Sequence, residues 1–335
     1  MGKTFYRPPH RRVLGLVAAA LLLFGCADDD GRREAGRPTA TPATQTVAPP
    51  AQPTRGPGGR QQRHAGARRT EPGGASGTVA IFEPARPAPA RAPVVVFTQG
   101  VGPAAYQGWI DHLVGRGSIV IFQDRPFRGV SLQERRVGSA AGLRAALRLL
   151  TRPGHVRPRL DAVVLVGHSI GAIMAAQLAA DAVSQRLPRP RAVFALQPPQ
   201  EDEPGLRLLR RIPPSTLMLV LASDQDDRVG EDGARALWAA VGHLSAANRD
   251  YVRVRSDQRG PVALRADHLF PLSAAGNPPD ALDFFGPWKL LDGLQRCATL
   301  RRDCEFAMGG TRRQRFMGRW SDGRPVLPLE TGEPR

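Results

Sequence analysis

The stretch "VVLVGHSIGAIMAA", Val163–Ala176, joins an apolar run to the glycine-flanked pentapeptide GHSIG and then to a series of small residues. The pentapeptide fits G-x-S-x-G, in the strand-turn-helix context that this pattern requires. A turn this sharp strains the backbone at Ser169, so Gly167 and Gly171 must lack side chains. The pattern predicts an exposed nucleophilic Ser169 hydroxyl, with the Ile170 N–H placed to stabilise negative charge. Helix capping is the alternative role for Ser169, but a cap does not need both glycines.

Short runs rich in Val and Ile alternate with segments of helical periodicity after Gly77. Strands are expected at 78–84, 92–99, 118–124, 161–168, 191–198, 215–223 and 250–257. Helices are expected at 105–117, 134–150, 170–187 and 233–249. This alternation predicts an α/β fold, with a mostly parallel sheet and helices on both faces.

A dinucleotide-binding domain is the rival interpretation of that alternation. Gly100, Gly102 and Ala105 fit G-x-G-x-x-G/A after an expected strand, and Asp124 ends the next strand. Pro103, however, removes a backbone N–H from the turn that would bind a pyrophosphate. The G-x-S-x-G stretch therefore favours the other interpretation.

A serine hydroxyl needs a base, and in this arrangement the partners follow in the order Ser, Asp or Glu, His. Only His243 and His268 follow Ser169 in the chain. His243 lies within an expected helix, whereas His268, in "RADHLFPL", follows the last expected strand. We therefore expect His268 to be the base.

The globular part resembles α/β-hydrolases of the serine esterase group that includes chlorophyllase-like, platelet-activating-factor-acetylhydrolase-like and polyester-hydrolase-like enzymes. The resemblance covers 78–326. Besides GHSIG, it rests on "AYQGWIDHLVGRGSIVIF", "LPRPRAVFALQP" and "DALDFFGPWKLLDGLQRC…RFMGRWSDGRPV". It implies an acyl-enzyme mechanism, in which His268 takes the Ser169 proton, the alkoxide attacks an ester carbonyl and water releases the acid. Neither a metal nor an organic cofactor is required.

The acid that orients His268 should lie beyond a strand between Ser169 and His268. Residues 223–229 fit the G-x-x-D-x-x-V pattern in which hydrolases of this fold often place the acid, with serine in place of glycine. This predicts Asp226. Asp227 is a close alternative, and Glu201 or Asp202 is a less common one.

The segment "FTQGVG", 97–102, occupies the loop where relatives carry His-Gly-x or a similar glycine motif. The resemblance implies that the Val101 N–H pairs with the Ile170 N–H in an oxyanion hole. Gln99 departs from the pattern, because it stands where a histidine is frequent.

The N-terminus has basic residues and then the apolar run "VLGLVAAALLLFG", 13–25. This run is too short to span a bilayer as a helix and is typical of a secretory signal. Leu23, Gly25 and Cys26 resemble the lipobox of bacterial lipoproteins, although Phe24 is an uncommon occupant. The resemblance implies a lipid on Cys26 and a membrane anchor at the cell envelope. An ordinary signal peptide and a secreted protein are the alternative.

Residues 26–77 are crowded with Pro, Gly, Thr and Arg, so we expect a disordered tether before a domain at 78–326 and a tail at 327–335. The formal net charge of +17 raises nucleic acid as a partner. No motif that combines aromatic and basic residues accompanies the charge, so we expect a solvated basic surface and no binding of nucleic acid. Attraction to an anionic membrane stays open. We also expect a monomer.

Cys297 and Cys304 remain as an even pair once Cys26 is assigned to lipid, and we expect a disulfide between them. Seven residues of continuous helix rise about 10.5 Å, so this bond would require a loop at 298–303. Two reduced thiols are the alternative, and the spacing is weak evidence for a metal site.

Three functions from different classes follow. The first is a serine hydrolase of carboxylic esters, whether lipid, polymer, aryl or cell-envelope esters, and the sequence does not separate it from an acyltransferase. The second is a catalytically silent, tethered binding or scaffold protein, and the third is a dinucleotide-dependent oxidoreductase.

Overall fold

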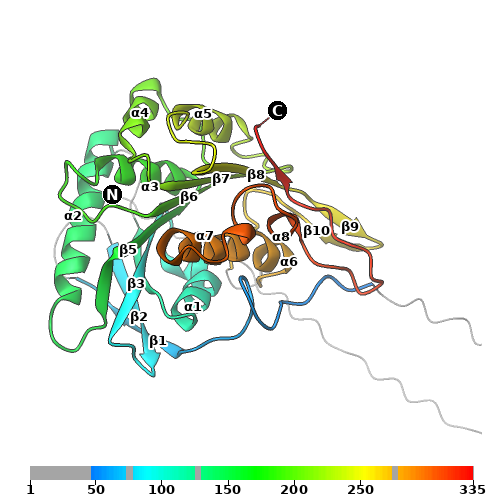
Figure 1. The fold of residues 1–335 in the computed structure, drawn as a ribbon, viewed down its shortest axis with the longest axis horizontal. Helices are drawn as coiled ribbons and strands as arrows, with labels where there is room; N and C mark the ends of the chain where they lie inside the picture. The colour runs from blue at the N-terminus through cyan, green and yellow to red at the C-terminus, as the bar shows by residue number, and fades with distance from the viewer. Residues whose placement is uncertain (1–46, 73–77, 125–129, 274–277, 335) are drawn as a thin grey trace, which may run out of the picture. The chain divides into compact units, whose positions relative to one another are not determined.

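The computed structural model describes residues 47–72, 78–124, 130–273 and 278–334. They build a sheet of nine strands in the order β1-β2-β4-β3-β5-β6-β7-β8-β11 (Figure 1). The strands are β1 (Ala65–Thr70), β2 (Thr78–Arg86), β3 (Arg91–Gln99), β4 (Ile119–Asp124), β5 (Arg157–His168), β6 (Ala192–Leu196), β7 (Leu217–Ser223), β8 (Arg249–Val254) and β11 (Glu330–Thr331). The run from β4 to β8 is parallel throughout, while β1, β2 and β11 pair antiparallel. The predicted α/β fold with a mostly parallel sheet is confirmed.

Helices cover both faces of the sheet (Figure 1). Side chains of α1 (Gln107–Gly115) and α7 (Lys289–Leu300) belong to one apolar cluster. Those of α2 (Leu132–Leu150), α3 (Ile170–Asp181) and α5 (Asp232–Ala240) belong to the other. The central strands contribute to both clusters because their successive side chains alternate between the two faces.

The remaining elements are short. Three helices have six residues or fewer, namely α4 (Glu203–Leu208), α6 (Ala281–Asp283) and α8 (Arg312–Arg315). β9 (Asp257–Arg259) pairs with β10 (Val262–Leu264) in a small hairpin. Strand β3 shows why the centre of the sheet was recognisable, since 94–97 are fully buried. A parallel strand that is covered on both faces must be apolar at successive positions, without alternation.

The expected tether at 26–77 is wrong for residues 47–72, which are part of the domain. β1 adds an antiparallel strand beside β2, and the Gly58 N–H donates a buried hydrogen bond of 2.8 Å to the Asp292 carboxylate. These contacts use the backbone, so they need none of the large apolar side chains whose absence suggested disorder. The signal at 1–25, Cys26 and the rest of the tether up to 46 and at 73–77 lie outside the described residues.

The C-terminal boundary at 326 is also wrong, because the domain continues to β11. Leu329 is fully buried, and Glu330–Thr331 pairs with β8. The segment before β11 is held by the Lys289 ammonium, which donates to the carbonyl oxygens of Gln314 and Phe316 at 2.7 and 2.6 Å.

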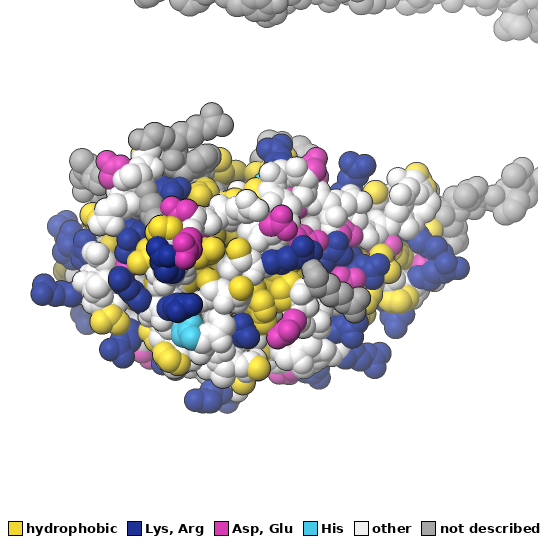
Figure 2. Space-filling model, turned by 90° about the horizontal axis from the view of Figure 1, so that it is seen from above, with side chains coloured by type: hydrophobic (Ala, Val, Ile, Leu, Met, Phe, Trp, Pro, Cys, Tyr) yellow, Lys and Arg dark blue, Asp and Glu magenta, His cyan; other side chains and the backbone are white. Residues whose placement is uncertain are grey.

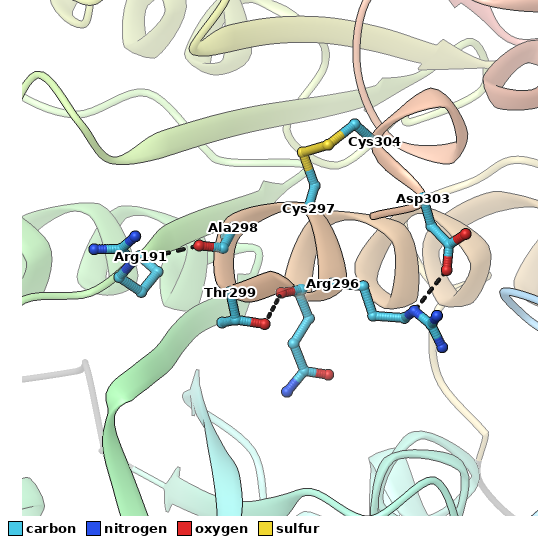
Figure 3. Close-up of a disulfide and its surroundings, with 8 residues drawn as sticks. Arg191, Arg296, Cys297, Ala298, Thr299, Asp303 and Cys304 are labelled. Carbon is cyan, nitrogen blue, oxygen red and sulfur yellow. Dashed lines mark hydrogen bonds and ion pairs between the residues drawn. A yellow bond between two sulfur atoms is a disulfide. The ribbon is translucent and has the colours of Figure 1, made fainter. Parts of the chain in front are cut away.

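A disulfide joins Cys297 to Cys304, as predicted (Figure 3). The expectation that all of 298–303 must be loop is wrong, since α7 continues to Leu300. The chain then reverses through Arg301 and Asp303, which have left-handed φ values of 52° and 61°. This reversal brings the two Cα atoms to 4.6 Å.

Arginine and lysine side chains are spread over the face shown in Figure 2, several of them beside carboxylates and with apolar side chains between them. No helix within the described residues is long and apolar enough to cross a membrane.

The double substitution Cys297→Ser and Cys304→Ser is expected to lower the free energy of unfolding by about 2 kcal/mol. The reason is that the closed loop is short, and the stabilisation from a crosslink grows with loop length. Urea unfolding of both forms, followed by circular dichroism, measures the difference. An unchanged midpoint would show that the helix end and its reversal hold without the bond.

Candidate active site

Ser169 lies at the turn between β5 and α3, with φ 56° and ψ −132°. A Cβ atom on Gly167 would come within 1.9 Å of the Gly171 carbonyl oxygen, and one on Gly171 within 1.9 Å of the Thr98 carbonyl oxygen. Both glycines are therefore required by direct backbone contact. The strain at Ser169 is held by the packing of three backbone segments against one another.

The base predicted for Ser169 lies beside it. His268 Nε2 is 3.0 Å from Ser169 Oγ. His268 follows the β9–β10 hairpin and is buried, and a parallel bridge between Gln225 and Asp267 ties its loop to the chain after β7. Two loops from separate parts of the sequence thus meet at the carboxyl end of β5.

The predicted acid completes the arrangement. Asp226 Oδ2 is 2.7 Å from His268 Nδ1, and Asp226 Oδ1 accepts the N–H groups of Arg228 and Val229, each at 3.1 Å. Burial by itself would raise the Asp226 pKa, but the hydrogen bonds from His268 and the two N–H groups outweigh it and lower the pKa below its ordinary value. The carboxylate is thus ionised and fixes the imidazole so that Nε2 faces Ser169.

The alternative residues lie elsewhere in the domain. Asp227 is exposed, and Asp202 caps α4 by accepting the Gly205 N–H. Glu201 accepts the Asp202 N–H, and the His243 ring donates to the Ile212 carbonyl oxygen at 2.9 Å. The structure brings together Ser169, His268 and Asp226, and none of these alternatives joins them.

The loop expected to supply the oxyanion hole is fixed against the turn at Ser169. Thr98 Oγ1 donates to the Gly171 carbonyl oxygen at 2.7 Å, and the Gln99 amide donates to the His168 carbonyl oxygen at 2.9 Å. Val101 follows two residues later and is 44% exposed. Ile170 is the first residue of α3. The roles of the Val101 and Ile170 N–H groups as oxyanion donors stay predictions.

A buried polar network that the sequence interpretation missed runs beneath these residues. His168 Nδ1 lies 2.6 Å from the Tyr106 hydroxyl, and His168 Nε2 lies 3.0 Å from Gln197 Oε1. The Gln197 amide nitrogen in turn donates to Ser223 Oγ and, at 2.8 Å, to the Asp267 carbonyl oxygen. Since Gln197 Oε1 can only accept, the proton of His168 is on Nε2, and Nδ1 accepts the Tyr106 O–H.

This network links the Ser169 turn to the residue immediately before His268. Gln99 also donates to the Tyr106 hydroxyl, so the loop expected to form the oxyanion hole is part of the same network. His168 was excluded as a base because it precedes Ser169, and that exclusion hid its structural role. Gln197 had one sequence signal, its position at the end of a buried strand.

His168 is neutral at physiological pH. Burial, and then the charge of the neighbouring His268 ring, lower its pKa to about 3. The two ring centroids are 4.8 Å apart. A neutral His168 leaves His268 free to accept a proton without facing a second positive charge at that distance.

The glycine loop of the rival dinucleotide interpretation is engaged internally. The Gly100 N–H donates to Gln99 Oε1 at 2.6 Å, and Pro103 begins a single 3₁₀ turn, Pro103–Tyr106, that delivers Tyr106 into the network. An N–H that a pyrophosphate would need is therefore already used. No group of three or more His, Cys, Asp or Glu side chains in the described part of the chain is arranged to hold a metal ion.

No protein-family model matches this chain, and no curated protein matches it in sequence.

We expect Gly171→Ala to destabilise the domain by about 3 kcal/mol or more, because the new methyl group would overlap the backbone of β3. The matched control is Gly102→Ala, where φ is −63° and the nearest heavy atom would be 3.6 Å away. Thermal unfolding of both variants provides the comparison. Equal transition temperatures would contradict the close approach described above.

The low pKa of His168 predicts a loss of stability in acid. The unfolded chain binds a proton at His168 below about pH 6.5 and the folded protein does not, so stability is complete above that pH and falls as the pH drops toward 3. Between pH 7 and pH 4.5 this single group should cost about 2 to 3 kcal/mol.

The His168→Asn variant cannot be protonated at this position, so its free energy of unfolding should fall less steeply over the same range. Denaturant unfolding at a series of pH values gives both slopes. Parallel pH profiles for the two proteins would mean that His168 is protonated in the fold.

Proposed function

We propose that this protein is a serine hydrolase that cleaves carboxylic esters through an acyl-enzyme intermediate. The observation that carries the proposal is the chain of hydrogen-bonding distances from Ser169 Oγ through His268 to Asp226, at 3.0 and 2.7 Å. The parallel sheet, the strained serine at a strand-to-helix turn and the order Ser, Asp, His further support an α/β-hydrolase of the serine esterase group.

In the proposed reaction, His268 Nε2 takes the Ser169 proton as the oxygen attacks the ester carbonyl carbon. Asp226, held ionised by three hydrogen bonds, stabilises the imidazolium that forms. The N–H groups of Ile170 and Val101 are the proposed donors to the oxyanion. The imidazolium then protonates the leaving alcohol, and a water activated by His268 releases the acid from Ser169.

The surroundings of the triad favour an ester with an apolar portion. Leu269, directly after His268, is 39% exposed, and Val101, on the loop after β3, is 44% exposed. Exposed apolar side chains on two loops beside a nucleophile provide surface that a hydrocarbon group can cover. A lipid, polymer or aryl ester fits this description, and a sugar ester with a short acyl group fits it less well.

Anchoring at the cell envelope through a lipid on Cys26 is part of the proposal and rests on the sequence, as does secretion if Cys26 is not modified. The disulfide between Cys297 and Cys304 supports a compartment outside the cytoplasm in either case. The competing proposal, a silent binding or scaffold protein, would leave the aligned triad without a use.

Hydrolysis of p-nitrophenyl acetate, butyrate and octanoate tests the proposal. Ser169→Ala should lower turnover by roughly 10⁴-fold or more, since the nucleophile is lost and only binding and oxyanion contacts remain. Ser184→Ala, which changes an exposed serine in the turn after α3, is the matched control and should leave the rate unchanged. Octanoate should be preferred over acetate if Leu269 and Val101 contact the acyl chain.

Covalent labelling by a fluorophosphonate probe gives an independent measurement. Labelling of the wild type and of Ser184→Ala, but not of Ser169→Ala, is expected. A wild type that neither takes the probe nor releases p-nitrophenol would reject the hydrolase and leave the scaffold as the better account.

A further inference from the structure

The amino ends of the central strands carry arginines on the edge of the sheet opposite the triad. Arg91 begins β3, Arg157 begins β5, and the two residues are direct partners in the β3–β5 register. Both are exposed. Like charges at directly opposed positions repel each other. Within the described ranges neither arginine forms a direct ion pair, and the carboxylate that feels the Arg91 charge, Asp161, is already paired with Arg159.

A groove of about 590 Å³ opens beside these two residues, between the start of β5 and the end of α2. Positive charge and apolar side chains line it together. The charge comes from Arg91, Arg148 and Arg157, and the apolar side chains are those of Leu147, Leu150 and Leu160. Leu160 is 49% exposed although it is a large aliphatic side chain. Cationic groups at the border of an apolar groove are suited to an amphiphile with an anionic head.

A second, smaller cavity of about 270 Å³ continues the same edge. It shares Arg91 with the first and extends past Arg159 to Leu300, which is 51% exposed at the end of α7. Arg191, just before β6, donates to the Ala298 carbonyl oxygen, which fixes the end of α7 at this edge (Figure 3). The two cavities thus adjoin each other at Arg91.

We define the amino-edge surface as Arg91, Arg148, Arg157, Arg159, Leu160 and Leu300. Asp161, beside these residues, is exposed and forms an ion pair with Arg159, and Asp292, which also lines the smaller cavity, is buried and paired with Arg116. Four arginines against one carboxylate leave a net positive surface with two exposed leucines. Guanidinium groups form paired hydrogen bonds to phosphate oxygens, and leucines at the same level can enter the headgroup boundary.

We infer that the amino-edge surface docks on a bilayer that presents anionic phospholipids. A nucleic acid would also supply phosphates, but proteins that hold single strands add aromatic side chains on which bases stack. Neither cavity is lined by Phe, Tyr or Trp, whereas both contain exposed leucines. The apolar component therefore favours lipid.

Docking in this way fixes where the triad faces. β5 is 12 residues long and connects Arg157 to the turn at Ser169. Because of a register shift, the stretch from Arg157 to Gly167 lies beside only seven steps of β3, from Arg91 to Thr98, so at about 3.3 Å per step the Ser169 hydroxyl lies some 25 Å from the docked edge. This step rests on the proposed hydrolase: its substrate is then an ester held away from the bilayer surface and not a phospholipid of the docked leaflet.

The test is co-sedimentation with vesicles of phosphatidylcholine alone and of phosphatidylcholine with one third phosphatidylglycerol. The chain from Thr46 onward is used, because residues 46–335 form one compact unit and the apolar run at 13–25 is then absent. We expect binding to the anionic vesicles alone, weakening as salt is added. Arg91→Gln/Arg148→Gln/Arg157→Gln should weaken it on the order of 10- to 100-fold.

Arg312→Gln/Arg319→Gln/Arg324→Gln removes the same charge from exposed positions in the C-terminal segment and is the matched control. This control should bind like the wild type, and Leu160→Ser should weaken binding with all arginines intact. Equal losses in the two triple variants would overturn the inference by assigning the attraction to net charge. A wild type that binds duplex DNA but not anionic vesicles would overturn it in favour of nucleic acid.

Binding is measured without catalysis, so Ser169→Ala should sediment as the wild type does even if the proposed hydrolase activity is absent. For the orientation, vesicle-bound protein should hydrolyse a water-soluble p-nitrophenyl ester at the rate of free protein. Strong inhibition on binding would place the triad against the bilayer and reject the docked orientation, while leaving the hydrolase intact.

Discussion

The close approach of three backbone segments at the carboxyl end of β5 is the constraint on which the rest of the site depends. There is no room for a Cβ atom between Gly167 and the Gly171 carbonyl or between Gly171 and the Thr98 carbonyl, so β3, β5 and the first turn of α3 can approach this closely only with glycine at both positions. That contact holds Ser169 at a φ that serine rarely adopts. It also sets where the loop after β3 can run, because Thr98 bonds the same turn with its side chain.

The polar network below Ser169 extends this constraint across the sheet. A buried hydrogen bond contributes modestly when it is formed, but leaving one partner unsatisfied costs more. Tyr106 is hydrogen-bonded to His168, and His168 to Gln197. Gln197 also donates to the backbone carbonyl of the residue before His268. Because each member is buried, a shift of one would leave its neighbour unpaired. The network therefore ties the position of His268 to that of Ser169.

The parts of the fold that could be predicted from sequence are those that apolar side chains build. Every expected strand from β2 to β8 and the helices α1, α2, α3 and α5 are present. The two predicted partners of Ser169 also lie within hydrogen-bonding distance of one another, since chain order and loop position left few candidates. The parts that were missed, β1 and β11, are held by backbone pairing at the two edges of the sheet. Backbone pairing leaves almost no trace in the pattern of side chains.

The network was missed for a related reason, because buried polar residues such as Gln197 look the same in sequence as exposed ones.

The ordered segment at 47–72 changes how far the domain can be from a membrane. With a lipid on Cys26, only about 20 residues (27–46) would separate the anchor from the first described residue, instead of the roughly 50 that a tether ending at 77 allows. Fully extended, about 20 residues reach no more than some 70 Å, against about 180 Å for 50. The volume that the domain can reach would then be more than tenfold smaller, and its local concentration at the bilayer correspondingly higher.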